Sequence, residues 1–227
     1  MGLLAFGSDS KTVKGEAQGV LTGILYLIPD DTLCPMAATA GCREACLVTA
    51  GRGAFTNVQA GRKRKTDLFY TDSVAFVDAL AKEIGLAVKR AAKKGMDLAI
   101  RLNGTSDIPW ENKKGSAGLS LMELFPAVQY YDYTKLPTRK TPANYHLTVS
   151  YSGVNDAYAA KAQDSAHNLA VVFDKKENIP LVFAGRPVIS GDLTDLRFTD
   201  PTGVVVALYA KGAAKKDTSG FVVRLSA

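Results

Sequence analysis

The chain has 227 residues, of which 47% are hydrophobic, so it is long and apolar enough to bury the core of one globular domain. A mean hydropathy of +0.01 argues against disorder, and no apolar run approaches the ~20 residues that a membrane-spanning helix needs. The formal net charge of +6 is compatible with a polyanionic partner but identifies none.

The first residues carry no strong structural signal. Residues 1–20 are rich in Gly, Ser and Lys, and we interpret them as an N-terminal arm or an edge hairpin before a single α/β domain over residues 21–227. Residues 1–6 are too short and lack the basic lead-in of a signal peptide, which favours a cytoplasmic protein. Residues 21–28 form a continuous apolar run that predicts a buried strand.

All three cysteines, Cys34, Cys42 and Cys46, lie within thirteen residues after this strand. The odd number and the short loops between them argue against a disulfide framework. We expect the segment to begin in a loop and to enter a helix in which Cys42 and Cys46 lie one turn apart on the same face. Three sulfurs would then point at one metal centre.

The identity of this metal follows from the number of ligands. Zinc would need a fourth protein ligand, and the two histidines, His146 and His167, lie far along the chain. Three thiolates with an open fourth position are typical of a [4Fe–4S] cluster. The alternatives are zinc and unligated cysteines in a packed loop. Asp107 or Asp192 is an alternative protein ligand for the fourth iron.

Two helices follow the cysteines. Residues 55–70 are predicted to be helical, with Val58, Leu68 and Phe69 facing inward and the basic run 62–65 facing outward. Asp72 caps a longer helix, which ends at Gly95. Residues 96–102 form the next strand, and we expect it to run parallel to the first.

The remaining elements are shorter. Helices are expected over residues 119–125 and 156–166, and strands over residues 128–133, 145–149, 169–173, 182–184, 188–189 and 204–209. This alternation predicts an α/β fold with a mostly parallel sheet.

Polar residues follow several of these strands, and the carboxyl ends of parallel strands meet at one edge of a sheet. We expect seven of them to bind a cofactor beside the cysteines: Arg101, Asn103, Thr105, Asp107, Lys135, Ser150 and Asp192. Residues 103–107 suit amino, carboxylate or ribose groups, and an inward Arg101 suits a carboxylate or phosphate. The alternatives are ordinary solvent-facing strand ends, and an outward Arg101 covered by Trp110.

The cysteine run and several later motifs resemble the bacteriophage gene product 88 family. The motifs are Cys34-Pro-Met36, Gly41-Cys42, Cys46-Leu47, residues 49–53, 101–108, 131–135, 144–148, 188–192, 197–201 and 216–221. The chain is more distantly similar to radical S-adenosylmethionine (SAM) enzymes, although its Cys-x7-Cys-x3-Cys spacing differs from their Cys-x3-Cys-x2-Cys. This second resemblance implies an incomplete, TIM-like barrel with the cysteine loop after the first strand, and SAM bound at the open iron.

Two functional hypotheses follow. The favoured one is an iron–sulfur enzyme with radical-SAM-like catalysis on an unknown small molecule. The other is a non-catalytic cluster-binding phage protein, acting as a redox sensor or a nucleic-acid-associated module through its basic clusters, such as residues 62–65 and 89–94. Under either hypothesis we expect the protein in the cytoplasm of the infected host, without a membrane partner.

Overall fold

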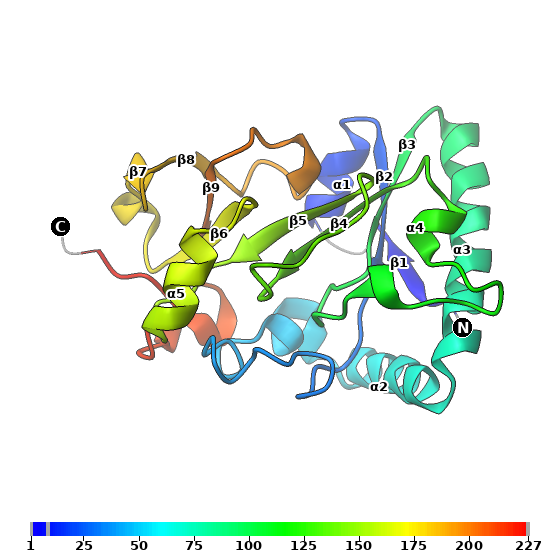
Figure 1. The fold of residues 1–227 in the computed structure, drawn as a ribbon, viewed down its shortest axis with the longest axis horizontal. Helices are drawn as coiled ribbons and strands as arrows, with labels where there is room; N and C mark the ends of the chain where they lie inside the picture. Colours follow the sequence, from blue (N-terminus) through cyan, green and yellow to red (C-terminus); the bar gives the residue numbers. More distant parts are fainter. Residues whose placement is uncertain (1, 8–9, 226–227) are drawn as a thin grey trace.

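The computed structural model describes residues 2–7 and 10–225, and over these ranges nine strands form one sheet (Figure 1). Their order across the sheet is β1-β2-β3-β4-β5-β6-β9-β8-β7. The bounds are Leu4–Phe6 (β1), Val20–Leu25 (β2), Asp97–Arg101 (β3), Gln129–Thr134 (β4), Tyr145–Ser150 (β5), Asn168–Phe173 (β6), Val182–Phe183 (β7), Arg186–Ser190 (β8) and Val205–Tyr209 (β9).

The sheet is mostly parallel, as predicted. The seven strands from β2 to β8 in the spatial order run parallel to one another. Only the two edge strands, β1 and β7, pair antiparallel among the described strands. The edges do not meet, so the sheet is not closed into a barrel. Strand β1 pairs antiparallel with β2 at one edge, but a short helix over Ser10–Glu16 separates the two strands, so they do not form the simple hairpin that the sequence offered as one interpretation.

Five α-helices connect or flank the described strands: α1 (Ser10–Glu16), α2 (Thr56–Thr71), α3 (Ser73–Lys94), α4 (Leu121–Leu124) and α5 (Asp156–Gln163). The predicted ends of α3 are confirmed. The Asp72 carboxylate accepts a hydrogen bond from the Ala75 N–H, and Gly95 ends the helix in the left-handed region at φ 64°. No helix among the described residues is both long and apolar enough to cross a membrane.

The two faces of the sheet have different neighbours. Helices α3 and α4 pack against alternate residues of the first strands, such as Leu21, Ile100 and Leu147, and this contact buries the main core (Figure 1). The opposite face carries Ala99 and Tyr131 and is covered by residues around the 3₁₀ turn η5 (Arg197–Thr199). The intervening positions of β3 and β4 therefore face away from α3.

Three local predictions were wrong. Cys42 and Cys46 do not lie in an α-helix, because residues 35–45 form consecutive turns. Leu68 is 53% exposed, since Phe69 alone fills the space beside Phe76 and Trp110. Trp110 is buried in that aromatic cluster and does not cover Arg101.

The basic run on α2 does not simply face solvent. The Arg62 guanidinium stacks on the Tyr26 ring and donates to the Val48 carbonyl at 2.6 Å. The Lys65 ammonium donates to the Leu3 carbonyl at 2.6 Å. Two of the four basic side chains thus hold neighbouring segments in place, which leaves a smaller surface for a polyanion.

Candidate functional site

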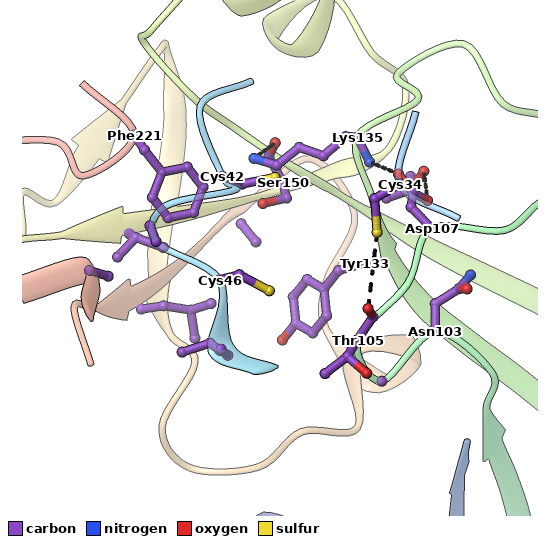
Figure 2. A pocket seen from close by; sticks show the side chains of 18 of the residues that line it. Cys34, Cys42, Cys46, Asn103, Thr105, Asp107, Tyr133, Lys135, Ser150 and Phe221 are labelled. Atoms are coloured by element: carbon purple, nitrogen blue, oxygen red, sulfur yellow. Dashed lines mark hydrogen bonds between the residues drawn. The ribbon is translucent and has the colours of Figure 1, made fainter. Parts of the chain in front are cut away.

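A cavity of about 480 Å³ lies at the carboxyl ends of the parallel strands. The ten residues predicted from the sequence as metal or cofactor ligands all line it: Cys34, Cys42, Cys46, Arg101, Asn103, Thr105, Asp107, Lys135, Ser150 and Asp192. Figure 2 shows the three sulfur atoms facing a common space, with Tyr133, Lys135 and Phe221 on the walls around it. The fold therefore brings together residues that are up to 158 positions apart, from Cys34 to Asp192.

The cysteine segment is shaped by backbone turns. The Cys34 N–H donates to the Asp30 carbonyl at 2.8 Å, and the Cys42 N–H donates to the Ala37 carbonyl at 3.1 Å. Between them Gly41 adopts φ 62°, where a Cβ atom would lie 2.5 Å from the Val154 side chain. The segment consequently turns inward as a loop rather than continuing as a helix, and this turn points the cysteines at the cavity.

The three thiols are free and half-buried. The Cys34 sulfur lies 4.0 Å from the Thr105 carbonyl oxygen. Burial, reinforced by the Asp107 carboxylate and the other two thiols, raises the pKa of Cys34 to about 12. Burial also raises the pKa of Cys42, while the Lys135 ammonium opposes this shift. A metal centre would have to displace the thiol protons of these cysteines, because only the thiolate form binds a metal.

Asp107 is buried against the end of β4. Its carboxylate accepts hydrogen bonds from the Thr134 hydroxyl at 2.8 Å and from the Lys135 backbone N–H at 2.7 Å, and the Arg139 guanidinium lies 3.7 Å away. Burial raises the pKa of Asp107, and these donors oppose the shift. Asp107 therefore joins the ends of β3 and β4. To bind an iron, its carboxylate would have to give up hydrogen bonds that it already accepts.

Lys135 extends across the same wall. Its ammonium donates to the carbonyl oxygens of Ser150 at 2.9 Å and Tyr151 at 3.2 Å. It also lies 4.7 Å from the centre of the Phe221 ring and 5.7 Å from that of Tyr158. Burial lowers the pKa of Lys135 to about 8. Ser150 contributes its backbone carbonyl here, which the sequence could not distinguish from its hydroxyl.

Arg101 points inward and is paired. Its guanidinium donates to Asp195 at 2.9 Å, stacks on the Tyr133 ring at 4.9 Å and lies 3.9 Å from the buried Asp132. The inward orientation that a carboxylate or phosphate clamp requires is present, but Asp195 already occupies one edge of the fork. A ligand anion would have to share the guanidinium with Asp195.

Asn103 and Thr105 use their side chains inside the protein. The Asn103 amide oxygen accepts hydrogen bonds from the Ser106 hydroxyl, the Ile108 N–H and the Trp110 indole, at 2.8, 2.9 and 3.1 Å. The Thr105 hydroxyl donates to the Leu27 carbonyl at 2.5 Å. Both residues line the cavity, yet these bonds shape its wall and leave little for gripping a ligand.

Asp192 lies on the loop after β8, where its carboxylate is 3.9 Å from the Lys211 ammonium. The polar residue directly after β6, Asp174, does not line the cavity. Asp174 instead pairs with Arg224 at 3.7 Å. Its place in the wall is taken by residues within β6 and β9: Ala170, Val172, Leu208 and Tyr209.

Sequence patterns missed several lining residues, including Met36, Leu47, Ala214 and Phe221. The last two come from the C-terminal segment, which is attached to β6 through the bridge between Phe173 and Val223. Phe221 ends the motif 216–221, but nothing in that motif places it at the cavity, because the position of both residues depends on β9 lying between β6 and β8. Tyr133 had a signal: it shares the face of Tyr131 by strand alternation.

The histidines do not approach the cysteines. The His167 ring nitrogen Nε2 lies 3.0 Å from the Arg139 carbonyl oxygen, and His146 is on β5 beside Thr148. Neither lines the cavity. Within residues 2–7 and 10–225, no three His, Cys, Asp or Glu side chains group closely enough to hold a metal ion.

Comparison with known proteins supports the resemblance drawn from the motifs. A search of curated proteins and a search of solved structures gave no match. A scan against protein families matches residues 3–225 to the family described as Gene product 88. This match spans nearly the whole chain, including every residue that lines the cavity. The chain therefore belongs to the gene product 88 family.

Proposed function

We propose that this protein binds a [4Fe–4S] cluster through Cys34, Cys42 and Cys46, and that one iron stays open to the rest of the cavity. One observation carries the proposal: the three thiols of a single loop line the same cavity as the polar ends of the neighbouring parallel strands. Ligand sites of parallel α/β sheets lie at this edge. The open iron would face the walls formed by β3, β4 and β5.

The number and kind of the ligands bear on which group fits. A zinc ion holds each of its sulfur ligands at about 2.3 Å, so its ligands crowd together. The described Cys, His, Asp and Glu side chains form no group of three that is compact enough for one ion. A cluster of four irons is larger than a single ion and accepts ligands from several sides. The lining holds three thiols and no histidine, and three thiolates with an open position are typical of such a cluster.

The fold adds a second line of support. Parallel strands follow one another across the sheet from β2 to β6, with α3 and α4 on one face and the cavity on the other. Sequential parallel strands also follow one another in TIM-like barrels, and we propose the sheet as a partial barrel of this kind. The radical-SAM-like enzyme remains the favoured version of the function, with a small molecule as substrate.

When bound and reduced, the cluster would supply the electron that cleaves SAM. The chain's own residues would position the reactants. Arg101, with Asp195 and Tyr133, offers both charges and a ring for a zwitterionic ligand. Ala170, Val172 and Leu208 form an apolar wall that excludes water from the reacting groups.

The test is the spectrum of protein purified without oxygen. We expect a broad absorption at about 400 nm. After reduction with dithionite, we expect an electron paramagnetic resonance signal that changes when SAM is added. A colourless protein after reconstitution with iron and sulfide would contradict cluster binding. A cluster whose signal ignores SAM would contradict the enzyme and favour a redox sensor. Binding to nucleic acid that weakens steeply with salt would then identify the nucleic-acid module.

A further inference from the structure

The cations around the cavity are not equally neutralised. Among the described lining residues, Arg101, Lys135 and Lys211 are the basic ones. Arg101 pairs with Asp195 at 2.9 Å, and Lys211 lies 3.9 Å from Asp192. No ion pair of Lys135 occurs within the described ranges. Its ammonium has only two neutral carbonyl acceptors and two aromatic rings.

The uncompensated charge is also the buried one. Lys135 is 8% exposed, whereas the side chain of Lys211 is 49% exposed. The buried Asp107 carboxylate accepts hydrogen bonds from the Thr134 hydroxyl and the Lys135 backbone N–H and forms no ion pair with the ammonium. A buried charge is costly unless it is paired. The Lys135 ammonium is thus a buried positive charge with which no carboxylate of the described residues forms an ion pair.

Cys42 lies beside this charge. Figure 2 shows its sulfur and the Lys135 side chain on the same side of the cavity. The Lys135 ammonium donates to the carbonyl oxygen of Ser150, which lines the cavity beside Cys42. Three thiolates would bring three negative charges into the cavity, and the Lys135 ammonium would offset part of them.

We propose that Lys135 is a positioning residue that compensates the negative charge of the thiolate-bound group at Cys42 and makes it easier to reduce. This inference rests on the proposed cluster. A fixed cation stabilises the reduced state more than the oxidised state, because reduction adds one negative charge. The same ammonium, through Ser150, Tyr151 and Phe221, ties the C-terminal segment to the strand ends.

The first test is a redox titration of the reconstituted protein by electron paramagnetic resonance. Lys135→Met should lower the equilibrium constant for one-electron reduction about tenfold, which is about 59 mV more negative. Lys161→Met, on the exposed side of α5, is the control for the loss of one charge and should leave the potential unchanged. An unchanged potential in Lys135→Met would overturn the inference. If Lys135→Met does not fold, Lys135→Gln removes the charge and can still donate to the carbonyls.

The second test needs no cluster. In the metal-free chain, the rate of Cys42 alkylation is measured with iodoacetate, which is anionic, and with iodoacetamide, which is neutral. The ratio of the two rates cancels the thiolate population and reports the local charge. The rate with iodoacetate divided by the rate with iodoacetamide should fall several-fold in Lys135→Met and stay constant in Lys161→Met. An unchanged ratio in Lys135→Met would refute a compensating charge. A wild-type protein that fails to take up a cluster would defeat the proposed function, while this ratio still decides the role of Lys135.

Discussion

The loops after the neighbouring parallel strands β2 and β3 use their polar groups in opposite ways. In the β3 loop, Asn103 satisfies three buried donors and Thr105 bonds back to Leu27. In the β2 loop, the thiols make only long contacts, such as 4.0 Å from the Cys34 sulfur to the Thr105 carbonyl oxygen. The β3 loop forms a rigid wall through its own hydrogen bonds, whereas the thiols of the β2 loop make only long sulfur contacts and remain available as ligands. A binding site needs both, because the rigid loop holds the wall against which the reactive loop is placed.

The largest effect should come from the cysteines. Cys34→Ser, Cys42→Ser and Cys46→Ser should each abolish cluster binding, measured as iron and sulfide per chain after reconstitution. The stability of the metal-free chain should change by less than about 1 kcal/mol, because the thiols make no strong bonds. Met36→Leu alters the same cavity without removing a thiol and should keep the cluster. Full iron content in all three serine variants would show that the β2 loop is not the ligand loop.

Asn103→Ala should have the largest effect on folding. The substitution leaves the Ser106 hydroxyl, the Ile108 N–H and the Trp110 indole without their acceptor in a buried site. At about 1–3 kcal/mol per unsatisfied group, with some relaxation, the free energy of unfolding should fall by about 3–5 kcal/mol. Urea denaturation of the metal-free chain measures it.

The matched control for Asn103 is Asn112→Ala, at an exposed position of η3 (Trp110–Asn112). It should change stability by less than about 0.5 kcal/mol. Equal effects of the two substitutions would mean that the β3 loop is no more of a scaffold than its surroundings.

A smaller loss is expected for Gly104→Ala, where the two loops touch. A Cβ atom at Gly104 would lie 2.7 Å from the Leu25 carbonyl oxygen and 2.6 Å from the Tyr26 ring. Backbone must move, which should cost about 1–3 kcal/mol. Gly61→Ala, inside α2 with its nearest atom at 3.9 Å, should instead stabilise the protein by about 0.5–1 kcal/mol. Denaturant midpoints decide, and a neutral Gly104→Ala would deny the close contact of the loops.

The smallest effect should be that of Asp72→Ala, which removes the cap of α3 on the far face of the sheet. Loss of the bond from the Ala75 N–H should cost about 1 kcal/mol. The cavity lies on the other side of the strands, so iron content should remain that of the wild type. A parallel loss of iron would show that the two faces are coupled, and thermal denaturation with an iron assay measures both quantities.

Much of the fold follows from local patterns. Asp72 and Gly95 delimit α3 in the sequence because capping and the left-handed C-terminus depend on single residues. Apolar runs likewise located β2, β3, β5, β6 and β9, since parallel strands are buried on both faces. The expected strand-end residues reached one cavity for the same reason: parallel strands place their carboxyl ends together.

The chemistry of each site residue was decided by the tertiary structure. Asn103 and Ser150 were expected to offer side chains to a ligand. Instead, the Asn103 amide oxygen accepts a hydrogen bond from the Trp110 indole, and the Ser150 carbonyl accepts one from the Lys135 ammonium. Phe221 reaches the cavity only because β9 inserts between β6 and β8. The sequence by itself indicated which residues gather at the edge of the sheet, because crossover connections between sequential parallel strands bring their carboxyl ends to the same edge. Which of their atoms remain available depends on partners that are distant along the chain, and these meet only in the folded structure.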